Sequence, residues 1–311
     1  MDRTRPSGGA LPICTGNEQN WRNFMAIETE IAWTDSTFNP WWGCVKVSDG
    51  CDNCYANSLA SRWGHDVWGH DKERRFLSES NWNQPLLWNS AANEIGERKK
   101  VFCASMADVF ERRDDLVPHR KRLLSLINHT ASLDWQVLTK RPQNIKKLLP
   151  ENYNYPPNLW LGTSVEHQDA ADKRIRYLLA HDRAVVRFLS CEPLLGPVDI
   201  RKHLQPGPNG AKIDWVIVGG EAGHHARPMN PLWAKSLIEQ CQEAGTPVFY
   251  KQWGDYVPLK RVSASGKQYR TIPVFKANGD EIPMVRVGKK AAGRVILGRE
   301  WSEFPDTSHA L

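Results

Sequence analysis

The 311-residue chain lacks the long apolar runs that would place it in a membrane or mark it for export. No run approaches the roughly 20 apolar residues that a membrane-spanning helix needs, and the mean hydropathy is −0.55. Residues 1–24 hold no continuous apolar stretch of the kind found in a secretory signal. Without such a signal, the seven cysteines are expected as thiols or metal ligands rather than as a disulfide framework. We therefore expect a cytoplasmic protein with no membrane partner.

The chain also lacks a strong excess of one charge. Lys and Arg number 41 against 35 Asp and Glu, a formal net charge of +6. This modest excess favours a nucleic-acid or nucleotide partner, although a merely soluble basic surface explains it equally well. The content of 14 Trp is high; most should lie in the core, and a minority could stack on a flat ligand such as a nucleobase.

No internal repeat is present, but one pattern recurs between residues 101 and 252: a short apolar run ends in polar residues, and a helical stretch or a loop follows. Continuous apolar runs are typical of parallel strands covered on both faces. The runs are Val101–Met106, Trp135–Leu138, Leu159–Gly162, Val185–Ser190, Trp215–Val218 and Val248–Tyr250. The predicted helices are Leu116–Ser132, Gln168–His181 and Pro231–Ala244, and a strand near Glu30–Trp33 and a helix from Cys54 to Trp63 begin the series. The alternation predicts an α/β fold with a partial or full (β/α) barrel of six to seven parallel strands; an open doubly wound sheet is the alternative.

Composition divides the chain into three regions. Residues 1–24 are polar and irregular, and precede Met25, so we interpret them as a disordered arm or as an extension upstream of the native start. Residues 25–254 form the predicted barrel. Residues 255–311 hold ten Lys and Arg against six Asp and Glu, and turn signals at Ser265-Gly266 and Asn278-Gly279 separate short strand-like pieces. These pieces, which predict a basic β-rich C-terminal extension, are Thr271–Phe275, Met284–Val287 and Arg294–Leu297.

Chemically active side chains follow six of the predicted strands. In a (β/α) barrel the active site lies at the C-terminal ends of the strands, so we expect these residues to line one pocket. They are Asp108, Lys140, Ser164 with Glu166, Cys191 with Glu192, Gly219-Gly220-Glu221, and Lys251. Cys191, Lys140 and Glu192 are the candidate catalytic residues; Cys191 would donate a hydrogen atom or bind metal, unless it is only a small packing residue.

The glycine turn Gly219-Gly220 could bring backbone amides close to a bound cofactor, because glycine leaves no side chain in the way. Glu221 would then suit ribose hydroxyls or an amino group. The alternative is a tight strand-to-helix turn without a ligand.

Three cysteines, Cys44, Cys51 and Cys54, have the spacing C-x6-C-x2-C, and no fourth cysteine follows nearby. Four thiolates would close a structural zinc or iron–sulfur site, whereas three on a 4Fe–4S cluster leave one iron open to a ligand. Cys54 precedes a predicted helix, whose dipole favours a thiolate or an anionic cluster. Zinc, with His65 or His70 as fourth ligand, and free redox thiols are the alternatives.

The motifs together resemble a phage- and prophage-associated three-cysteine-motif family that is similar to the radical S-adenosylmethionine superfamily. The resemblance extends from about residue 26 to the C-terminus. It rests on Trp33-Thr34-Asp35, Asn39-Pro40-Trp41-Trp42-Gly43-Cys44, Gly50-Cys51-Asp52-Asn53-Cys54-Tyr55-Ala56, Leu138-Thr139-Lys140-Arg141-Pro142, Leu161-Gly162-Thr163-Ser164-Val165-Glu166, Ser190-Cys191-Glu192-Pro193-Leu194, Val218-Gly219-Gly220-Glu221, Lys251-Gln252-Trp253-Gly254 and Gly298-Arg299-Glu300-Trp301.

The resemblance implies a partial (β/α) barrel, a 4Fe–4S cluster on Cys44, Cys51 and Cys54, and S-adenosylmethionine as cofactor. One-electron reduction, by a donor such as flavodoxin or ferredoxin, would give a 5′-deoxyadenosyl radical that abstracts a substrate hydrogen. The superfamily usually has C-x3-C-x2-C and a Gly-Gly-Glu after the second strand, whereas Glu221 follows about the sixth. Glu166, Glu192 and Glu221 are therefore all candidates for binding the cofactor's amino group, with Ser164 and the glycine turn beside them.

The sequence thus predicts a radical S-adenosylmethionine enzyme that modifies or repairs a nucleic acid or nucleotide. Two alternatives remain: a zinc-bearing, non-catalytic nucleic-acid-binding protein, and a barrel hydrolase that uses Glu166, Glu192 and Lys140 without radical chemistry.

Overall fold

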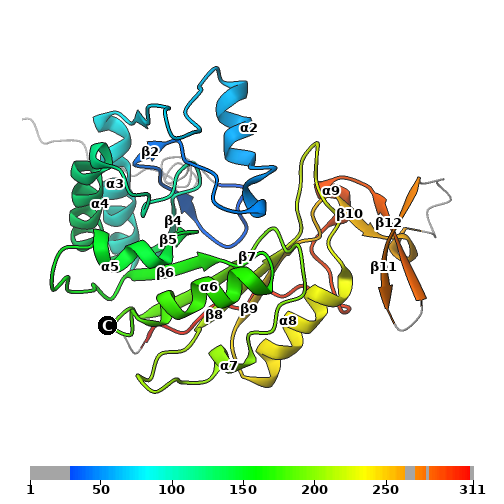
Figure 1. Ribbon diagram of the computed structural model, residues 1–311. Coiled ribbons are helices and arrows are strands. Elements are labelled where there is room, and N and C mark those ends of the chain that lie inside the picture. The colour runs from blue at the N-terminus through cyan, green and yellow to red at the C-terminus, as the bar shows by residue number, and fades with distance from the viewer. Residues whose placement is uncertain (1–28, 263–269, 278–279, 309–311) are drawn as a thin grey trace, which may run out of the picture.

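The chain folds around a curled seven-stranded sheet. The computed structural model describes residues 29–262, 270–277 and 280–308. All neighbouring strands of the sheet are parallel, in the order β1-β4-β5-β6-β7-β8-β9. The strands are β1 (Ser36–Thr37), β4 (Lys99–Cys103), β5 (Leu133–Thr139), β6 (Leu159–Ser164), β7 (Val186–Cys191), β8 (Trp215–Gly219) and β9 (Val248–Gln252). Because the spatial order follows the chain order, every connection advances in one direction, and the sheet forms a half-barrel (Figure 1). The predicted partial (β/α) barrel is confirmed; a doubly wound sheet would reverse direction.

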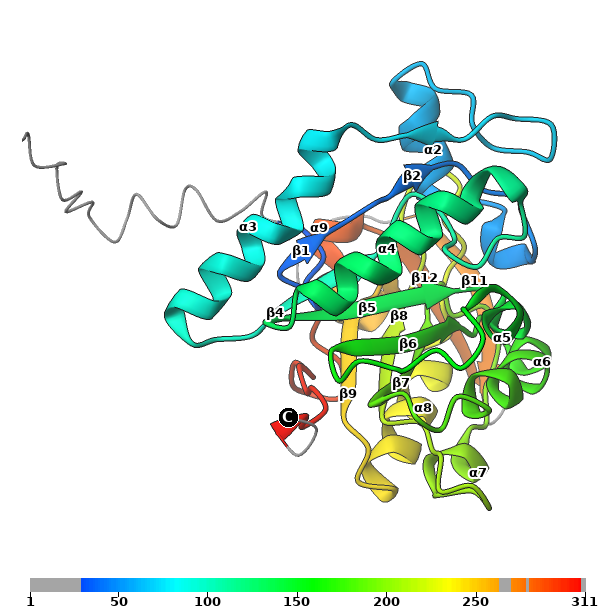
Figure 2. The ribbon, with the colours of Figure 1, turned by 90° about the vertical axis from the view of Figure 1, so that its left-hand side faces the viewer.

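Helices cover the outer face of the half-barrel (Figure 2). They are α3 (Glu79–Ile95), α4 (Val117–His129), α5 (Ile145–Leu148), α6 (Gln168–Leu179), α7 (Arg201–Leu204) and α8 (Pro231–Glu243). Local sequence explains the boundaries of α8: Asn230 accepts a hydrogen bond from the Leu232 amide, Pro231 begins the helix, and Gly245 follows its end with φ +65°. No helix in the described ranges is long and apolar enough to cross a membrane.

Aromatic side chains fill the inner face of the half-barrel. Trp33, Phe102, Trp160, Phe188 and Trp215 are all buried there in one cluster. Gly162 leaves the room that this cluster needs, since a Cβ at that position would lie 2.2 Å from the Phe188 ring. The inner core lies beneath the C-terminal ends of the strands and supports whatever binds above it.

An insertion between β1 and β4 carries the three-cysteine motif. It contains β2 (Trp41–Trp42), paired antiparallel with β3 (Arg75–Phe76), and α2 (Tyr55–Arg62). Helix α2 confirms the helix predicted from Cys54 to Trp63, and Cys54 is its N-cap residue.

The C-terminal extension first forms a three-stranded antiparallel sheet beside the half-barrel (Figure 1). Its strands lie in the order β10-β12-β11, with bounds β10 (Tyr256–Pro258), β12 (Asp280–Arg286) and β11 (Thr271–Ala277), and the short helix α9 (Lys289–Ala292) follows. The chain then returns along β9, where the Tyr250 amide donates to the Trp301 carbonyl at 2.9 Å. Phe304 packs on Trp215 and Phe249, so the last segment fills the gap at the open edge of the half-barrel.

Two predicted strands are wrong. No strand covers Glu30–Trp33, because the Thr34 amide closes a turn onto the Ile31 carbonyl at 3.2 Å; the first strand is the short β1. No strand covers Arg294–Leu297 either, since Leu297 itself has φ +53° and only an isolated bridge joins Ile296 to Arg299. The predictions for residues 1–24 and for the turns at Ser265-Gly266 and Asn278-Gly279 lie outside the described residues.

Candidate functional site

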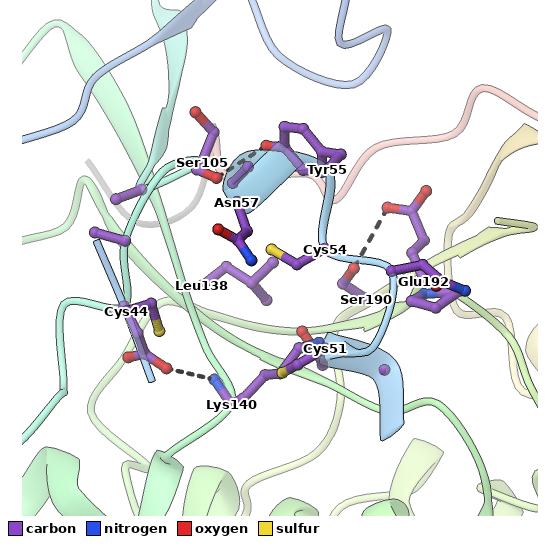
Figure 3. A pocket seen from close by; sticks show the side chains of 18 of the residues that line it. Cys44, Cys51, Cys54, Tyr55, Asn57, Ser105, Leu138, Lys140, Ser190 and Glu192 are labelled. Carbon is purple, nitrogen blue, oxygen red and sulfur yellow. Dashed lines mark hydrogen bonds between the residues drawn. The ribbon is translucent and has the colours of Figure 1, made fainter. Parts of the chain in front are cut away.

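A cavity of about 920 Å³ opens at the C-terminal ends of the strands. The three-cysteine insertion and the strand ends contribute to its walls (Figure 3). Lys289 of the C-terminal extension also lines it. Its lining includes Cys44, Cys51, Cys54, Tyr55, Asp108, Lys140, Arg141, Ser164, Ser190, Glu192, Gly220, Glu221, Lys251 and Lys289. Most of the residues predicted from the strand ends therefore meet at one place.

Residues 44–54, which we call the cysteine loop, bring all three motif cysteines to this cavity. Cys44, Cys51 and Cys54 are half-buried free thiols. Cys51 is the last residue of a short 3₁₀ turn, and Cys54 is the N-cap residue of α2, so two different backbone turns present these two thiols. Among the described residues, no three His, Cys, Asp or Glu side chains converge on one point as the ligands of a single metal ion do.

Arg141 holds the first cysteine in place. Its guanidinium donates to Asp108 at 2.8 Å and to the Val45 carbonyl at 2.7 Å, and its Nη1 lies 3.5 Å from Cys44 Sγ. Burial raises the pKa of the Cys44 thiol to about 12, and the nearby Arg141 charge opposes that shift. Burial likewise raises the pKa of Cys54. Both thiols are therefore protonated near neutral pH until a cation binds them.

Glu166 fastens the middle of the cysteine loop. One carboxylate oxygen accepts from Ser48 Oγ at 2.9 Å and pairs with Lys140 Nζ at 2.8 Å, and the other pairs with Arg174 at 2.6 Å. Burial by itself would raise the pKa of Glu166, but the Lys140 and Arg174 charges outweigh it and lower the pKa to about 2. A Cβ at Gly50 would lie 2.4 Å from this carboxylate, so the loop passes closely over it. Glu166 is fully buried and does not line the cavity.

Glu221 fastens the far end of the same loop. Its carboxylate accepts from Arg227 at 2.7 and 2.9 Å and from Asn53 Nδ2 at 3.1 Å. Arg227 also donates to the Asp49 carbonyl at 3.0 Å. We call Asn53, Glu221 and Arg227 the loop clasp. Glu221 borders the cavity, but its carboxylate oxygens already accept hydrogen bonds from Arg227 and Asn53.

Glu192 is the predicted carboxylate that faces the cavity with the fewest partners. Lys251 Nζ lies 3.1 Å from one oxygen, and Ser190 Oγ lies 3.4 Å from the other (Figure 3). Ser164 lines the same space. The pair Glu192–Lys251 offers an acceptor and a donor to a polar ligand.

The glycine turn is divided between the cavity and its wall. Gly220 lines the cavity and Gly219 does not. The Gly220 amide donates to the Gln252 carbonyl at 2.9 Å, and a Cβ on Gly220 would lie 2.0 Å from the Trp253 carbonyl oxygen. Glycine at position 220 therefore allows the backbones of two strand ends to pack closely beside the cavity.

Cys191 points away from the cavity. It is fully buried in the core between the sheet and the helices, and it does not line the cavity. Burial raises its pKa well above the ordinary value. The structure therefore does not place Cys191 where it could give a hydrogen atom to a ligand in the cavity.

For the zinc alternative, the described residues hold no group of three or more His, Cys, Asp or Glu that could bind one metal ion. His70 borders the cavity, whereas His65 packs against the Trp42 ring with centroids 5.6 Å apart. The hydrolase candidates form two separate ion pairs, Lys140 with Glu166 and Glu192 with Lys251.

Several residues of the site are not in the predicted set, among them Asn53, Tyr55, Ser190 and Lys289. Asn53 and Tyr55 flank Cys54 in the sequence, so their position beside the motif was a usable signal. Ser190 shares its strand face with Glu192, which alternation along a strand would have indicated. Lys289 belongs to the C-terminal extension, which the sequence predicts to be basic but does not assign to this cavity.

Among curated proteins, none matches the sequence. Among solved structures, a cysteine-to-serine mutant of spore photoproduct lyase is similar, with 14% identity and a TM-score of 0.42 over 85% of this chain and 72% of that chain. Residues 28–305 match the family described as "Protein of unknown function (DUF5131)", and the chain therefore belongs to that family.

Proposed function

We propose that this protein is a radical S-adenosylmethionine enzyme whose Cys44, Cys51 and Cys54 hold a 4Fe–4S cluster. One observation carries the proposal: three free thiols of one loop open into a single large cavity at the strand ends of a half-barrel. In a four-iron cluster each cysteine binds a different iron, so the thiols need not converge on one point. A single zinc ion would need that convergence, and the described residues do not provide it.

The surrounding residues fit the cluster better than a bare thiol site. Glu166 and the loop clasp hold the loop at two places, and Arg141 lies beside Cys44. Because buried thiols with raised pKa values lose their protons to bound iron, the positive Arg141 would partly offset the charge of the loaded site. When bound, the cluster and S-adenosylmethionine supply the one-electron chemistry that the chain itself lacks.

Within the cavity, Glu192 is the carboxylate that we assign to the cofactor's amino group or ribose. Glu166 is buried beneath the loop, and Glu221 is occupied by Arg227 and Asn53. Lys251 would orient the Glu192 carboxylate through their ion pair, and the walls of the half-barrel would exclude water from the reaction. The substrate class that we propose is a nucleic acid or nucleotide, on the basis of the net charge of +6.

Anaerobic loading with iron and sulfide tests the metal centre. Wild type and a Cys241→Ala control, which removes a buried thiol outside the cavity, should bind iron and sulfide and show a cluster signal by EPR after reduction. Cys44→Ala, Cys51→Ala and Cys54→Ala should each lose the cluster while they keep the far-ultraviolet circular dichroism of the fold. Full iron and sulfide in all three variants would refute the cluster, and stoichiometric zinc in the wild type would favour the binding-protein alternative.

Reaction chemistry is tested separately with the loaded protein. Reduced wild type should convert S-adenosylmethionine to 5′-deoxyadenosine, and Glu192→Gln should weaken S-adenosylmethionine binding about tenfold, a loss of about 1.4 kcal/mol, without loss of iron. A loaded protein that leaves S-adenosylmethionine intact under every reductant would contradict the enzyme class.

A further inference from the structure

We propose that the mouth of the cavity is a binding surface for single-stranded nucleic acid, with an aromatic side on α2 and a basic side on α9. The inference rests on the proposed function for the reaction that the strand undergoes. The binding surface itself is formed by side chains to which the proposed function assigns neither the metal nor the cofactor.

The aromatic side begins with Tyr55, the first residue of α2. Tyr55 lines the cavity, its side chain is 55% exposed, and its hydroxyl donates to the Ser105 carbonyl at 3.0 Å. The hydrogen bond fixes one edge of the ring. A fixed and accessible ring is suited to stacking on a flat ligand.

A second stacking element lies at the other end of α2. Trp63 directly follows the helix, is 55% exposed, and stacks on Trp42 with centroids 5.3 Å apart and an interplanar angle of 28°. The Arg75 guanidinium lies 4.5 Å from the centroid of the Trp42 ring. Tyr55 and Trp63 are eight residues apart, which is about 12 Å along a helix, so a strand of nucleotides leaving the cavity could reach both.

The basic side comes from the C-terminal extension. Lys289, in α9, lines the same cavity as Tyr55, and Lys290 follows it. Both side chains are exposed, and neither lysine forms an ion pair with another described residue. The other lysines of the cavity wall are already paired, Lys46 with Asp52, Lys140 with Glu166 and Lys251 with Glu192. Unpaired lysines at the mouth are therefore the charges that remain for an anionic ligand.

This combination favours one occupant. Accessible aromatic faces supplemented by an arginine, beside unpaired lysines, match the alternating bases and phosphates of a single strand. A duplex hides the faces of its bases within its own stack, so it could use only the lysines. An acidic peptide would likewise use the lysines but offers no regular series of flat rings.

Fluorescence anisotropy with labelled single-stranded DNA and RNA oligomers, and with a blunt DNA duplex, tests the surface. Trp63→Ala should weaken single-strand binding roughly tenfold, and Trp63→Phe should restore most of it, because stacking needs a ring rather than an indole. Leu87→Ala is the control, since Leu87 is 62% exposed on α3 and lines no part of the cavity.

The charged side is tested by salt dependence. The double variant Lys289→Glu and Lys290→Glu should reduce the slope of log K against log salt by about 1.4, as expected for two lost phosphate contacts on a single strand. The matched control is Lys121→Glu with Lys173→Glu, which changes net charge equally on exposed lysines of α4 and α6.

Each outcome decides the proposal. It is supported if the mouth variants weaken single-strand binding and the controls do not. It is overturned if the wild type binds no single strand, if the Lys121/Lys173 control loses as much affinity, or if the duplex binds as tightly and responds equally to Trp63→Ala. Iron content and 5′-deoxyadenosine formation, measured on the same variants, separate this result from a failure of the proposed radical chemistry.

Discussion

At the scale of single residues, three glutamates that follow neighbouring strands have three different environments. Glu166 is fully buried among cations, Glu221 is clasped by Arg227, and Glu192 faces the cavity. Sequence position alone made them equivalent candidates for one ligand. The difference arises from the cysteine loop, which packs over two of them and leaves the third open.

Glu166 should also make stability depend on pH. Its pKa is lowered to about 2 in the folded protein, from an ordinary value of 4.5. A lowered carboxyl pKa contributes stability that is fully present above the unfolded value and is lost as pH falls through the folded one. We therefore expect Glu166 to stabilise the fold by about 3 kcal/mol at neutral pH, with the loss falling between about pH 4.5 and pH 2.

Urea denaturation at a series of pH values measures this contribution. Glu166→Gln should lower the free energy of unfolding by about 3 kcal/mol at pH 7, because it leaves Lys140 and Arg174 buried without their partner. The difference from wild type should shrink as the pH approaches 2. Glu94→Gln, at an exposed position of α3, should behave as wild type throughout; a pH-independent difference would show that Glu166 acts by packing alone.

Strand parity explains which predicted residues reached the site. Successive side chains of a strand point to opposite faces, so Ser190 in the cavity places Cys191 in the outer core and turns Glu192 back toward the cavity. The parity rule was available from sequence and would have removed Cys191. The burial of Glu166 could not be predicted from the sequence, because it depends on how the chain continues after Ser164 and on contacts with Ser48 and Arg174.

At the scale of elements, the strands β4 to β9 and the helices α4, α6 and α8 were predictable because their apolar patterns match their burial. Helix α3 was not predicted, and it contains Pro85 within its length. The apolar pattern of Arg294–Leu297 predicts a strand, but only Ile296 of that segment is buried, and the positive φ of Leu297 turns the chain.

That terminal segment should stabilise the open edge of the half-barrel. Phe304 lies 5.3 Å from Trp215 and 5.5 Å from Phe249 between ring centroids, and Lys100 Nζ lies 4.9 Å from the centre of its ring. The side chain joins the β9 edge to β4. Since it is 37% exposed, Phe304→Ala should cost about 2 kcal/mol, less than a fully buried phenylalanine.

Thermal and urea denaturation would measure the cost of Phe304→Ala, with Leu87→Ala on α3 as the exposed apolar control. The variant should retain its iron and its single-strand affinity, because the segment lies away from the cavity lining. A variant as stable as wild type would show that the segment rests on the barrel without supporting it.

At the scale of the whole molecule, the cysteine loop is fixed to three strand ends at once. Arg141 follows β5, Glu166 follows β6, and Glu221 follows β8, and each contacts the loop. The sequence could predict that these residues gather at one rim, because parallel strands end together. It could not predict that they serve the loop rather than the ligand, since that depends on side chains such as Asn53 and Ser48 meeting them across more than 100 residues.

This arrangement couples metal loading to global stability. A cluster on three cysteines of one loop would bind the folded chain and not the unfolded one, so it should raise the melting temperature by at least about 5 °C relative to the apo protein. Removal of iron with a chelator should reverse the increase, and the variant with all three cysteines replaced by alanine should show none.

Arg227→Met, which opens the clasp on Glu221 but leaves every thiol, should load iron and then lose it faster than wild type to the same chelator. Arg176→Met, on the exposed surface of α6, should lose iron at the wild-type rate. Equal rates in all three proteins would show that the thiols alone retain the metal, and an unchanged melting temperature on loading would show that the iron is bound outside the folded loop.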